Sequence, residues 1–397
     1  MKSKEKNNLT ARYTAIQVCY WSGYAAVMGY ASVFLLGEGF TNTEIGLLSA
    51  LGCLLSAVLQ PAFATFADHP ESPSIRRILM GITLVQIFVA AALFFLRGPK
   101  VLIGVCYGGS ITLLMLTTPL LNSLGVETMN QGKELNFGAA RGLGSAAFAV
   151  ASFLLGRFTG KFSIKAVPLW IGLMGAGILL CLFWYPFQKT ERLLKETKKG
   201  KDSPIAFFRR YPRFTAVLVG CIFTFTSHAM INSFTFQIVM AKGGGKEELG
   251  IAMFLCAIVE LPTMFFFNFL LKIRDSGFWF RVSAVFFFLK SAATVLAPNI
   301  YAFYAVQFLQ MFGWALVSVA YVYYVNSIME PQDIIKGQAY MTMTITIGNV
   351  AGSLFGGPMI DAAGVNALLA ASTISSLIGM GILLFAAREK THGKAGE

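Results

Sequence analysis

Apolar stretches of roughly 20 residues recur along the whole chain, and this recurrence most narrows what the chain can fold into. A helix of about 20 apolar residues, rising 1.5 Å per residue, crosses the roughly 30 Å hydrocarbon core of a bilayer. Because backbone amides and carbonyls inside lipid need partners within the protein, each stretch is predicted to be a helix. The twelve predicted spans are 13–36, 44–67, 76–96, 100–122, 138–156, 166–187, 212–240, 249–271, 278–297, 300–327, 337–361 and 364–387, and the fourth can extend to Glu127.

The composition supports an all-α, multi-pass membrane protein and argues against soluble domains. Of the 397 residues, 56% are hydrophobic and 13% charged, and the mean hydropathy is +0.65. The chain has no HExxH, no GxSxG and no phosphate-binding glycine loop. We therefore do not expect an enzyme.

The charge distribution predicts the orientation in the membrane. The net charge is +13, but the Lys and Arg residues are concentrated in loops and tails, which fits a membrane surface better than nucleic acid. The positive-inside rule places both termini in the cytoplasm. We expect the protein in the cell membrane. The largest basic cluster lies in 188–213.

The six cysteines all lie inside apolar stretches without ligand-like spacing, so we expect neither disulfides nor a metal site. They are Cys19, Cys53, Cys106, Cys181, Cys221 and Cys256.

The two halves of the sequence echo each other weakly. A shift of 199 residues places Gly138–Arg141 on Gly337–Tyr340, each at the start of an apolar helix. We predict an N-terminal six-helix half at 1–187, a cytoplasmic linker at 188–211 and a C-terminal six-helix half at 212–397. Parallel halves with a site between them are typical of one class of secondary transporters.

Four charged residues lie in or beside the apolar stretches: Glu127, Arg141, Glu260 and Lys290. A charge near the bilayer centre costs about 2.5–3.5 kcal/mol on insertion scales, so such residues usually face a partner, a ligand or a water-filled path. These four are the first candidates for a functional site.

A short segment of the chain resembles a known family. Residues 59–68, ending in Asp68 and followed by Arg76 and Arg77, resemble the helix 2 to helix 3 signature of the major facilitator superfamily. More narrowly, the chain is similar to the oligosaccharide:proton symporter group that includes lactose permease. The residues that carry this similarity are Met28-Gly29, Gln60-Pro61, and Asn136-Phe137-Gly138 with Arg141.

The resemblance assigns expected roles to the four charges. It implies that Glu127 and Arg141 bind solute hydroxyls, and that Glu260 in helix 8 and Lys290 in helix 9 complete the inner site. Helix 10 departs from the group, because Gln307, Gln310 and Gly313 stand where lactose permease has titratable residues. Proton coupling through helix 10 and a galactoside substrate are therefore in doubt.

Each charged residue also has a structural interpretation. Glu260 is the predicted proton carrier, because desolvation disfavours a buried carboxylate charge; the alternative is an ion pair with Lys290. Arg141 is a predicted ligand contact or a clamp on Glu127. Glu127 can instead lie exposed at the cytoplasmic edge of its helix.

Other residues are secondary candidates. His228 suits proton exchange or a hydrogen bond within the helix bundle. Trp314, Tyr340 and Gln310 are predicted to contact ligand, with packing as the alternative for the two aromatic residues.

Two further groups have other expected roles. The aromatic residues of the first span, including Trp21, are assigned to interface anchoring or packing. Asp68, Arg76 and Arg77 are predicted to form a conformational latch, with a solvated turn as the alternative.

These observations predict a monomeric, proton-coupled symporter of a small polar solute, such as a glycoside, a nucleoside or an aromatic acid, working by alternating access. Its partners would be the solute, protons and membrane lipid, with no cofactor besides the proton gradient. The alternative is a proton-driven exporter of amphiphiles, suggested by the runs Phe265–Phe267 and Phe286–Phe288.

Overall fold

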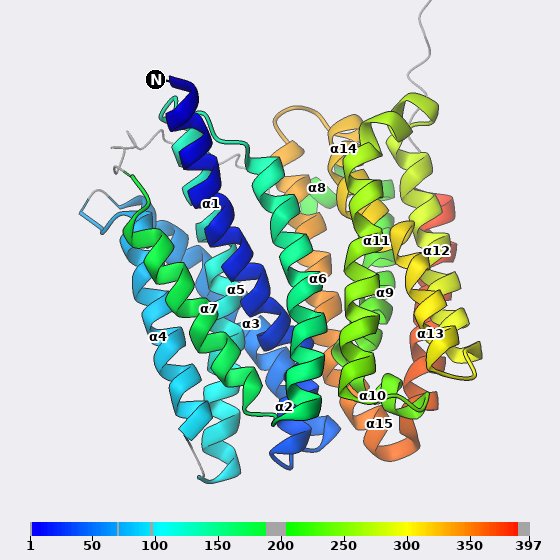
Figure 1. Ribbon diagram of the computed structural model, residues 1–397. Coiled ribbons are helices and arrows are strands. Elements are labelled where there is room, and N and C mark those ends of the chain that lie inside the picture. Colours follow the sequence, from blue (N-terminus) through cyan, green and yellow to red (C-terminus); the bar gives the residue numbers. More distant parts are fainter. Residues whose placement is uncertain (1, 70, 96–97, 188–203, 388–397) are drawn as a thin grey trace, which may run out of the picture. The chain divides into compact units, whose positions relative to one another are not determined.

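The computed structural model describes residues 2–69, 71–95, 98–187 and 204–387. Within these ranges the regular structure is helical throughout (Figure 1). The chain divides into two compact units, each with its own packing: residues 1–199 with 235–258, and residues 200–234 with 259–397. The predicted linker falls largely in 188–203, outside the described residues, so the predicted boundary between two six-helix halves stays a prediction.

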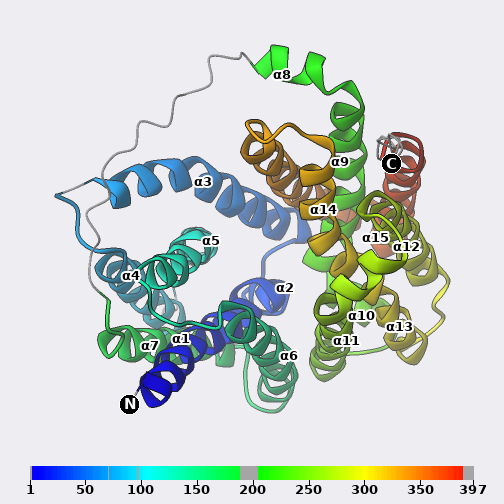
Figure 2. The same ribbon diagram turned by 90° about the horizontal axis from the view of Figure 1, so that it is seen from above.

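The first unit is built around the helices of the N-terminal half. In it α4 packs on both α5 and α7, α3 packs on α5, and α1 lies beside α6 and α7 (Figure 2). Its helices are α1 (Lys2–Tyr24), the π-helix η1 (Ala25–Gly29), α2 (Ala31–Gly37), α3 (Asn42–Asp68), α4 (Ile75–Phe95), α5 (Lys100–Asn130), α6 (Phe137–Lys161), α7 (Ala166–Phe183), α10 (Thr235–Ala241) and the first half of α11 (Lys246–Ile273).

The second unit centres on α9 and α15, which pack along each other, with α12 against both α14 and α15. Its buried core is rich in aromatic side chains, among them Phe214, Phe225, Phe280 and Tyr324. Besides the second half of α11, its helices are α8 (Pro204–Arg210), α9 (Pro212–Ser233), α12 (Ser276–Leu296), α13 (Ile300–Gln307), the 3-10 helix η2 (Phe308–Met311), α14 (Trp314–Ile328) and α15 (Ile334–Ala386).

The helices account for the predicted spans. Ten helical segments of the described chain are long and apolar enough to cross a membrane, and the pair Leu9–Gly29 and Ala31–Gly37, bent by 47°, forms one more. Helix α15 contains two spans, because Gly364 interrupts it with φ 79° and ψ 177°, a conformation open mainly to glycine. The prediction of twelve spans is confirmed, and α5 does continue past Glu127 to Asn130.

The bend in the first span has a local cause. Residues 25–29 adopt a π-helix, which disturbs the usual backbone hydrogen bonds. The hydroxyl of Tyr107 in α5 donates to the Val27 carbonyl at 2.9 Å, and that of Tyr30 donates to the Ser152 carbonyl of α6 at 2.7 Å. These bonds attach the bent segment to two neighbouring helices.

Two glycines allow α6 and the first half of α11 to cross at very short range within the first unit. A Cβ at Gly156 would lie 2.8 Å from the Lys246 carbonyl oxygen and 3.1 Å from the Gly250 Cα. A Cβ at Gly250 would lie 2.8 Å from the Ser152 carbonyl oxygen. Only glycine fits this crossing without a shift of backbone.

Candidate functional site

Three buried or half-buried polar residues of the second unit form a hydrogen-bonded chain. The Gln310 amide nitrogen donates to the Glu260 carboxylate at 3.0 Å, and its carbonyl oxygen accepts from the Lys290 ammonium at 2.5 Å. Lys290 is 4% exposed and Gln310 2%. The structure therefore brings three of the predicted residues together, with a neutral amide between the acid and the base.

Local irregularities of the helices position this chain, which we call the amide bridge. Gln310 lies in η2, where 3-10 geometry replaces the α-helix, and Gly313 follows with φ −87° and ψ −95°. Glu260 lies two residues before Pro262, which is inside α11 and removes a backbone donor from that helix. Broken helix segments at membrane depth typically line a polar site.

His228 lies in an aromatic setting in the same unit. Its ring stacks on Trp314, with centroids 4.7 Å apart and planes 6° apart, and it meets the edge of Phe287 at 5.3 Å. The His228 Nε2 atom is 2.8 Å from the Asn232 amide nitrogen, so the two share a hydrogen bond. Two candidates from distant parts of the sequence, His228 and Trp314, are thus in direct contact.

Three buried serines, one each from α9, α12 and α15, hydrogen-bond to one another. The Ser227 hydroxyl lies 2.9 Å from the hydroxyls of both Ser291 and Ser372, and those two are 3.3 Å apart. Ser372 also bonds the Ser227 carbonyl at 3.2 Å. Ser227 and Ser291 directly adjoin His228 and Lys290, so this ring fixes the backbone from which both candidate side chains extend.

Arg141 is held by contacts within the first unit. Its guanidinium carbon lies 3.8 Å from the ring centroid of Trp21, and its Nη1 donates to the Ser145 hydroxyl at 3.0 Å. The Asn136 side chain caps α6 by accepting from the Ala139 N–H, so Arg141 emerges from the second turn of a fixed helix. The side chain is half-buried.

Glu127 lies in the last turn of α5 and is half-buried. Its pairing with Arg141 stays a prediction.

Tyr340 lies against the short helix α8. Its ring centroid is 5.1 Å from that of Phe207 and 4.8 Å from that of Phe208. At the N-cap of α15, the helix that carries Tyr340, the buried carboxylate of Asp333 accepts from Arg210 at 3.1 Å and from the Tyr211 hydroxyl at 3.1 Å. The surroundings of Tyr340 are those of a packing residue that attaches α8 to the second unit.

The predicted latch is described only in part, because the Asp68 side chain lies outside the described residues. Arg76 Nη1 donates to the Tyr185 carbonyl at 2.8 Å, which joins the start of α4 to the segment after α7, and its buried Nε has no hydrogen-bond partner among the described side chains. Arg77 is exposed. The role of the three residues as a latch stays a prediction.

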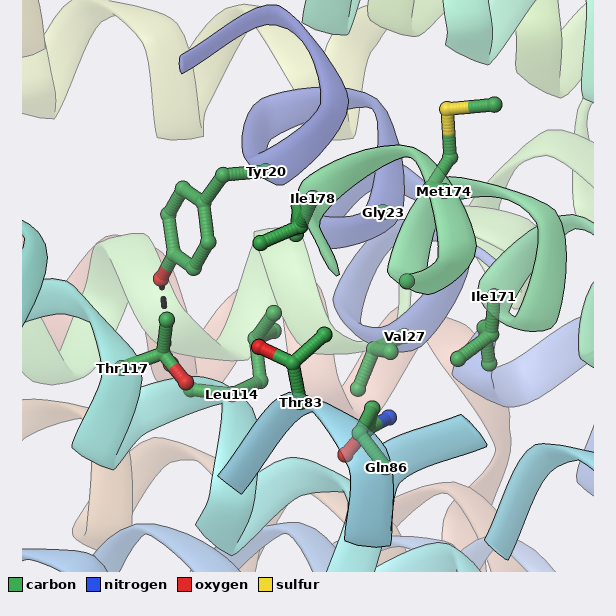
Figure 3. Close-up of a pocket in the computed structure, with 11 residues that line it drawn as sticks. Tyr20, Gly23, Val27, Thr83, Gln86, Leu114, Thr117, Ile171, Met174 and Ile178 are labelled. Carbon is green, nitrogen blue, oxygen red and sulfur yellow. Dashed lines mark hydrogen bonds between the residues drawn. The ribbon is translucent and has the colours of Figure 1, made fainter. Parts of the chain in front are cut away.

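Two cavities lie within the first unit. The smaller, about 30 Å³, lies between α1, α4, α5 and α7, and holds no more than roughly one or two water molecules (Figure 3). The larger, about 330 Å³, lies between α3 and α5 and has Pro61 and Pro119 in its wall. None of the predicted site residues lines either cavity.

A side chain of α3 satisfies a backbone carbonyl of α5 that Pro119 leaves without its helical hydrogen bond. Pro119 has no N–H, so the Met115 carbonyl loses its usual helical partner. The Gln60 amide donates to that carbonyl at 3.3 Å and to the Ser56 hydroxyl at 3.2 Å. In the sequence, Gln60 contributes only to the family resemblance. In the structure, it forms a hydrogen bond between α3 and α5.

The hydrogen bonds of Trp21 and its contact with Arg141 were not predicted from the sequence. The Trp21 indole N–H donates to the Gln17 side-chain carbonyl at 3.0 Å, and the Gln17 amide donates to the Tyr13 hydroxyl at 3.0 Å. A signal was present, since positions 13, 17 and 21 share one helix face. Trp21 was assigned to packing because the spacing does not show that Arg141 lies over its ring.

Comparisons with known proteins agree with this architecture. The sequence model described as "MFS_1 like family" matches residues 11–371. A protein of Bacillus subtilis (strain 168), described as "Uncharacterized transporter YwbF", is 25% identical over 394 residues, covering 96% of this chain and 95% of its own length.

Solved structures share the fold at low sequence identity. A mutant of the nucleoside transporter NupG gives a TM-score of 0.78 at 13% identity, covering 96% of this chain and 98% of that one. An auto-inhibited POT family peptide transporter gives a TM-score of 0.71 at 11% identity, covering 98% and 99%.

Proposed function

We propose that this membrane transporter, which belongs to the MFS_1 like family of the major facilitator superfamily, moves a small polar solute together with protons. The observation that carries the proposal is the amide bridge of Glu260, Gln310 and Lys290. It offers one acid that can gain and lose a proton, and one fixed cation, in a water-poor setting where charges are expensive.

The amide between the acid and the base suits reversible protonation of Glu260. Breaking a buried salt bridge by removing one partner costs about 3–5 kcal/mol, whereas a hydrogen bond to a charged group contributes about 1.5–3 kcal/mol. Because Gln310 lies between Glu260 and Lys290, separating these two groups costs a hydrogen bond and not a direct salt bridge, and Glu260 can then accept a proton. Lys290 then supplies donors for solute oxygens through its ammonium group.

Arg141 is the proposed solute contact of the first unit. Its guanidinium has five donors in a planar fork, which suits vicinal hydroxyls, a carboxylate or the polar edge of a nucleobase. The proposed solutes are glycosides, nucleosides and aromatic acids. Nucleosides are the first class to test, because the nucleoside transporter NupG shares the fold. Alternating access would expose the residues of both units to each side of the cell membrane in turn.

The exporter alternative gains no support from the phenylalanine run of α11. Phe265 and Phe266 are 64% and 66% exposed, while Phe267 is 2% exposed. In a membrane-spanning helix such exposed rings contact lipid, and Phe267 packs in the core. The run therefore needs no amphiphilic substrate to explain it.

Proteoliposomes test the proposal. A thermal-shift screen with uridine, methyl β-glucopyranoside and benzoate selects the solute, because a ligand stabilises the folded state it binds. Adding that solute outside should make the external medium more alkaline as protons enter with it. Glu260→Gln should abolish the pH change but keep solute exchange, which needs no net proton movement.

The matched control is Glu330→Gln, which neutralises an exposed carboxylate outside the spans and should leave the pH change intact. Solute uptake by the wild-type protein without any pH change would refute proton coupling.

A further inference from the structure

We propose that Trp21 is a positioning residue for Arg141, and that Gln17 and Tyr13 fix Trp21 in turn. This inference rests on the proposed role of Arg141 as a solute contact. We call Tyr13, Gln17 and Trp21 of α1 the relay. In this proposal, solute recognition in the first unit depends on the relay as well as on Arg141.

The last step of the relay is the contact between indole and guanidinium. The Arg141 Cζ lies 3.8 Å from the Trp21 ring centroid, well within the range of a cation–π interaction. Indole is the strongest of the aromatic partners for a cation. The ring also covers one face of the planar guanidinium, so the N–H groups remain directed outward in its plane.

The indole cannot rotate freely, because a chain of three hydrogen bonds holds it in place. Trp21 donates to Gln17, Gln17 donates to Tyr13, and Tyr13 donates to the Leu121 carbonyl of α5 at 3.0 Å. Tyr13 is fully buried and Gln17 is 1% exposed, so water does not compete for these bonds. The relay thus links α5 to the guanidinium of α6 through one face of α1.

A glycine on α6 makes room for the indole. A Cβ at Gly144 would lie 2.5 Å from the Trp21 Cδ1, too close for any side chain unless the ring moved. Gly144 is three residues after Arg141 and therefore on the same helix face. The Cδ1 edge of the ring can approach α6 this closely only because Gly144 has no side chain.

The expected consequence is a loss of affinity without loss of the donors. A free arginine side chain must lose rotamer freedom when a solute binds, and an arginine already held against a ring has lost part of it beforehand. Removing the ring should weaken solute binding between about three- and thirty-fold, the range that corresponds to a cation–π contact. The maximal transport rate should change much less.

The first test measures uptake of tritiated uridine by cells that express the transporter. Trp21→Leu should raise KM by that factor with little change in maximal rate, and Trp21→Tyr, which keeps an aromatic face, should recover part of the loss. Gln17→Leu should raise KM in the same direction. The control, Trp184→Leu, removes an exposed indole at the end of α7 and should leave KM unchanged. Equal losses in Trp21→Leu and Trp21→Tyr, falling on maximal rate alone, would contradict a positioning role.

A second test needs no solute. In a protein whose other four tryptophans, Trp170, Trp184, Trp279 and Trp314, are replaced by Phe, iodide and acrylamide quenching report on Trp21 alone. Arg141→Gln should lower quenching by anionic iodide relative to neutral acrylamide, because the positive charge over the ring is gone. Gln17→Leu should lower the same ratio by releasing the ring.

The two tests separate the two claims. An unchanged quenching ratio in both variants would overturn the relay, whatever the solute. A wild-type protein that gives no response to uridine would contradict the nucleoside class in the proposed function, and the quenching ratio would still decide whether Trp21 positions Arg141.

Discussion

At the scale of single residues, Gln310 occupies an unusual position for an uncharged side chain. Its amide nitrogen donates to the acid Glu260, and its amide oxygen accepts from the base Lys290. We predict that Gln310→Leu lowers the free energy of unfolding by about 1–3 kcal/mol, the cost of taking this acceptor from the buried Lys290 ammonium. Solute-driven proton movement should be lost as well.

Thermal unfolding of purified protein and the proteoliposome pH assay measure the two effects. Gln332→Leu is the control, because Gln332 is exposed outside the spans. If Gln310→Leu unfolds at the wild-type temperature, the amide does not support the charges as proposed.

Tyr211, which precedes the span of α9, gives a prediction about pH. Burial raises the pKa of its hydroxyl, the N–H of Glu330 lowers it, and the Asp333 carboxylate raises it further. A group with a raised pKa in the folded state stabilises it below the ordinary pKa, near 10 for tyrosine, and loses that contribution as the pH rises. The stability advantage of wild type over Tyr211→Phe should therefore be present at pH 8 and vanish as the pH rises above about 10.

Unfolding temperatures of the two proteins between pH 8 and 11 would check the prediction for Tyr211. Parallel curves for the two proteins would show that the hydroxyl does not matter for the attachment of α8.

Sequence reasoning identified several of these residues without their interactions. Charges in apolar stretches are conspicuous because burial is costly, so Glu260 and Lys290 could be selected from sequence. The bridge itself depends on η2, where a change from α to 3-10 geometry sets the direction of the Gln310 side chain. Hydropathy is insensitive to such a change, so the link between acid and base could not be predicted.

At the scale of helices, the crossing of α6 and α11 leaves no room for a side chain at Gly156. We predict that Gly156→Ala separates the two helices, because its Cβ would meet backbone atoms at 2.8 and 3.1 Å that cannot move independently. Overpacking of this kind costs about 1–3 kcal/mol, and solute uptake should fall with it. Thermal unfolding and uptake assays report the two effects.

The control for the helix crossing is Gly81→Ala, since a Cβ at Gly81 in α4 meets nothing within 4 Å. Wild-type uptake and stability in Gly156→Ala would mean that the helices adjust at no cost.

The helices themselves were largely predictable, and their bends were not. Span positions follow from hydropathy, and Asn136 and Asp275 begin α6 and α12 as N-caps, a recognisable sequence signal. The π-helix at 25–29 accepts a hydrogen bond from the Tyr107 hydroxyl of α5, and the hydroxyl of Tyr30, just after it, donates to the Ser152 carbonyl of α6. Tertiary contacts of this kind leave no trace in the local sequence.

At the scale of the whole molecule, the distribution of Lys and Arg predicts which loops face the cytoplasm. With both termini inside, Ser163, between α6 and α7, would face outward and Glu330, between α14 and α15, would face inward. In a protein without its six native cysteines, a membrane-impermeant maleimide should label Ser163→Cys in intact cells. It should label Glu330→Cys only after the cells are permeabilised. The reverse pattern would invert the orientation.

Residues 235–258 group with the first unit, while the predicted boundary between two halves stays a prediction. A repeat and a basic linker predict two halves that are continuous in sequence. The glycine crossing at Gly250 and the bond from Gln237 to Asn42 at 2.8 Å instead attach this segment to the N-terminal helices. Contacts between distant segments decide such membership, and periodicity does not report them.

If the proposed proton coupling runs through the amide bridge, this site would also limit how steeply the protein can accumulate a solute. It contains one acid, Glu260, and an amide does not ionise in the physiological range, so this site carries at most one proton per cycle. One elementary charge crossing a potential of 100 mV releases about 2.3 kcal/mol. For an uncharged solute, that energy supports a concentration ratio of roughly fifty across the membrane for each 100 mV. With no pH difference across the membrane, the solute pool inside the cell would therefore follow the membrane potential.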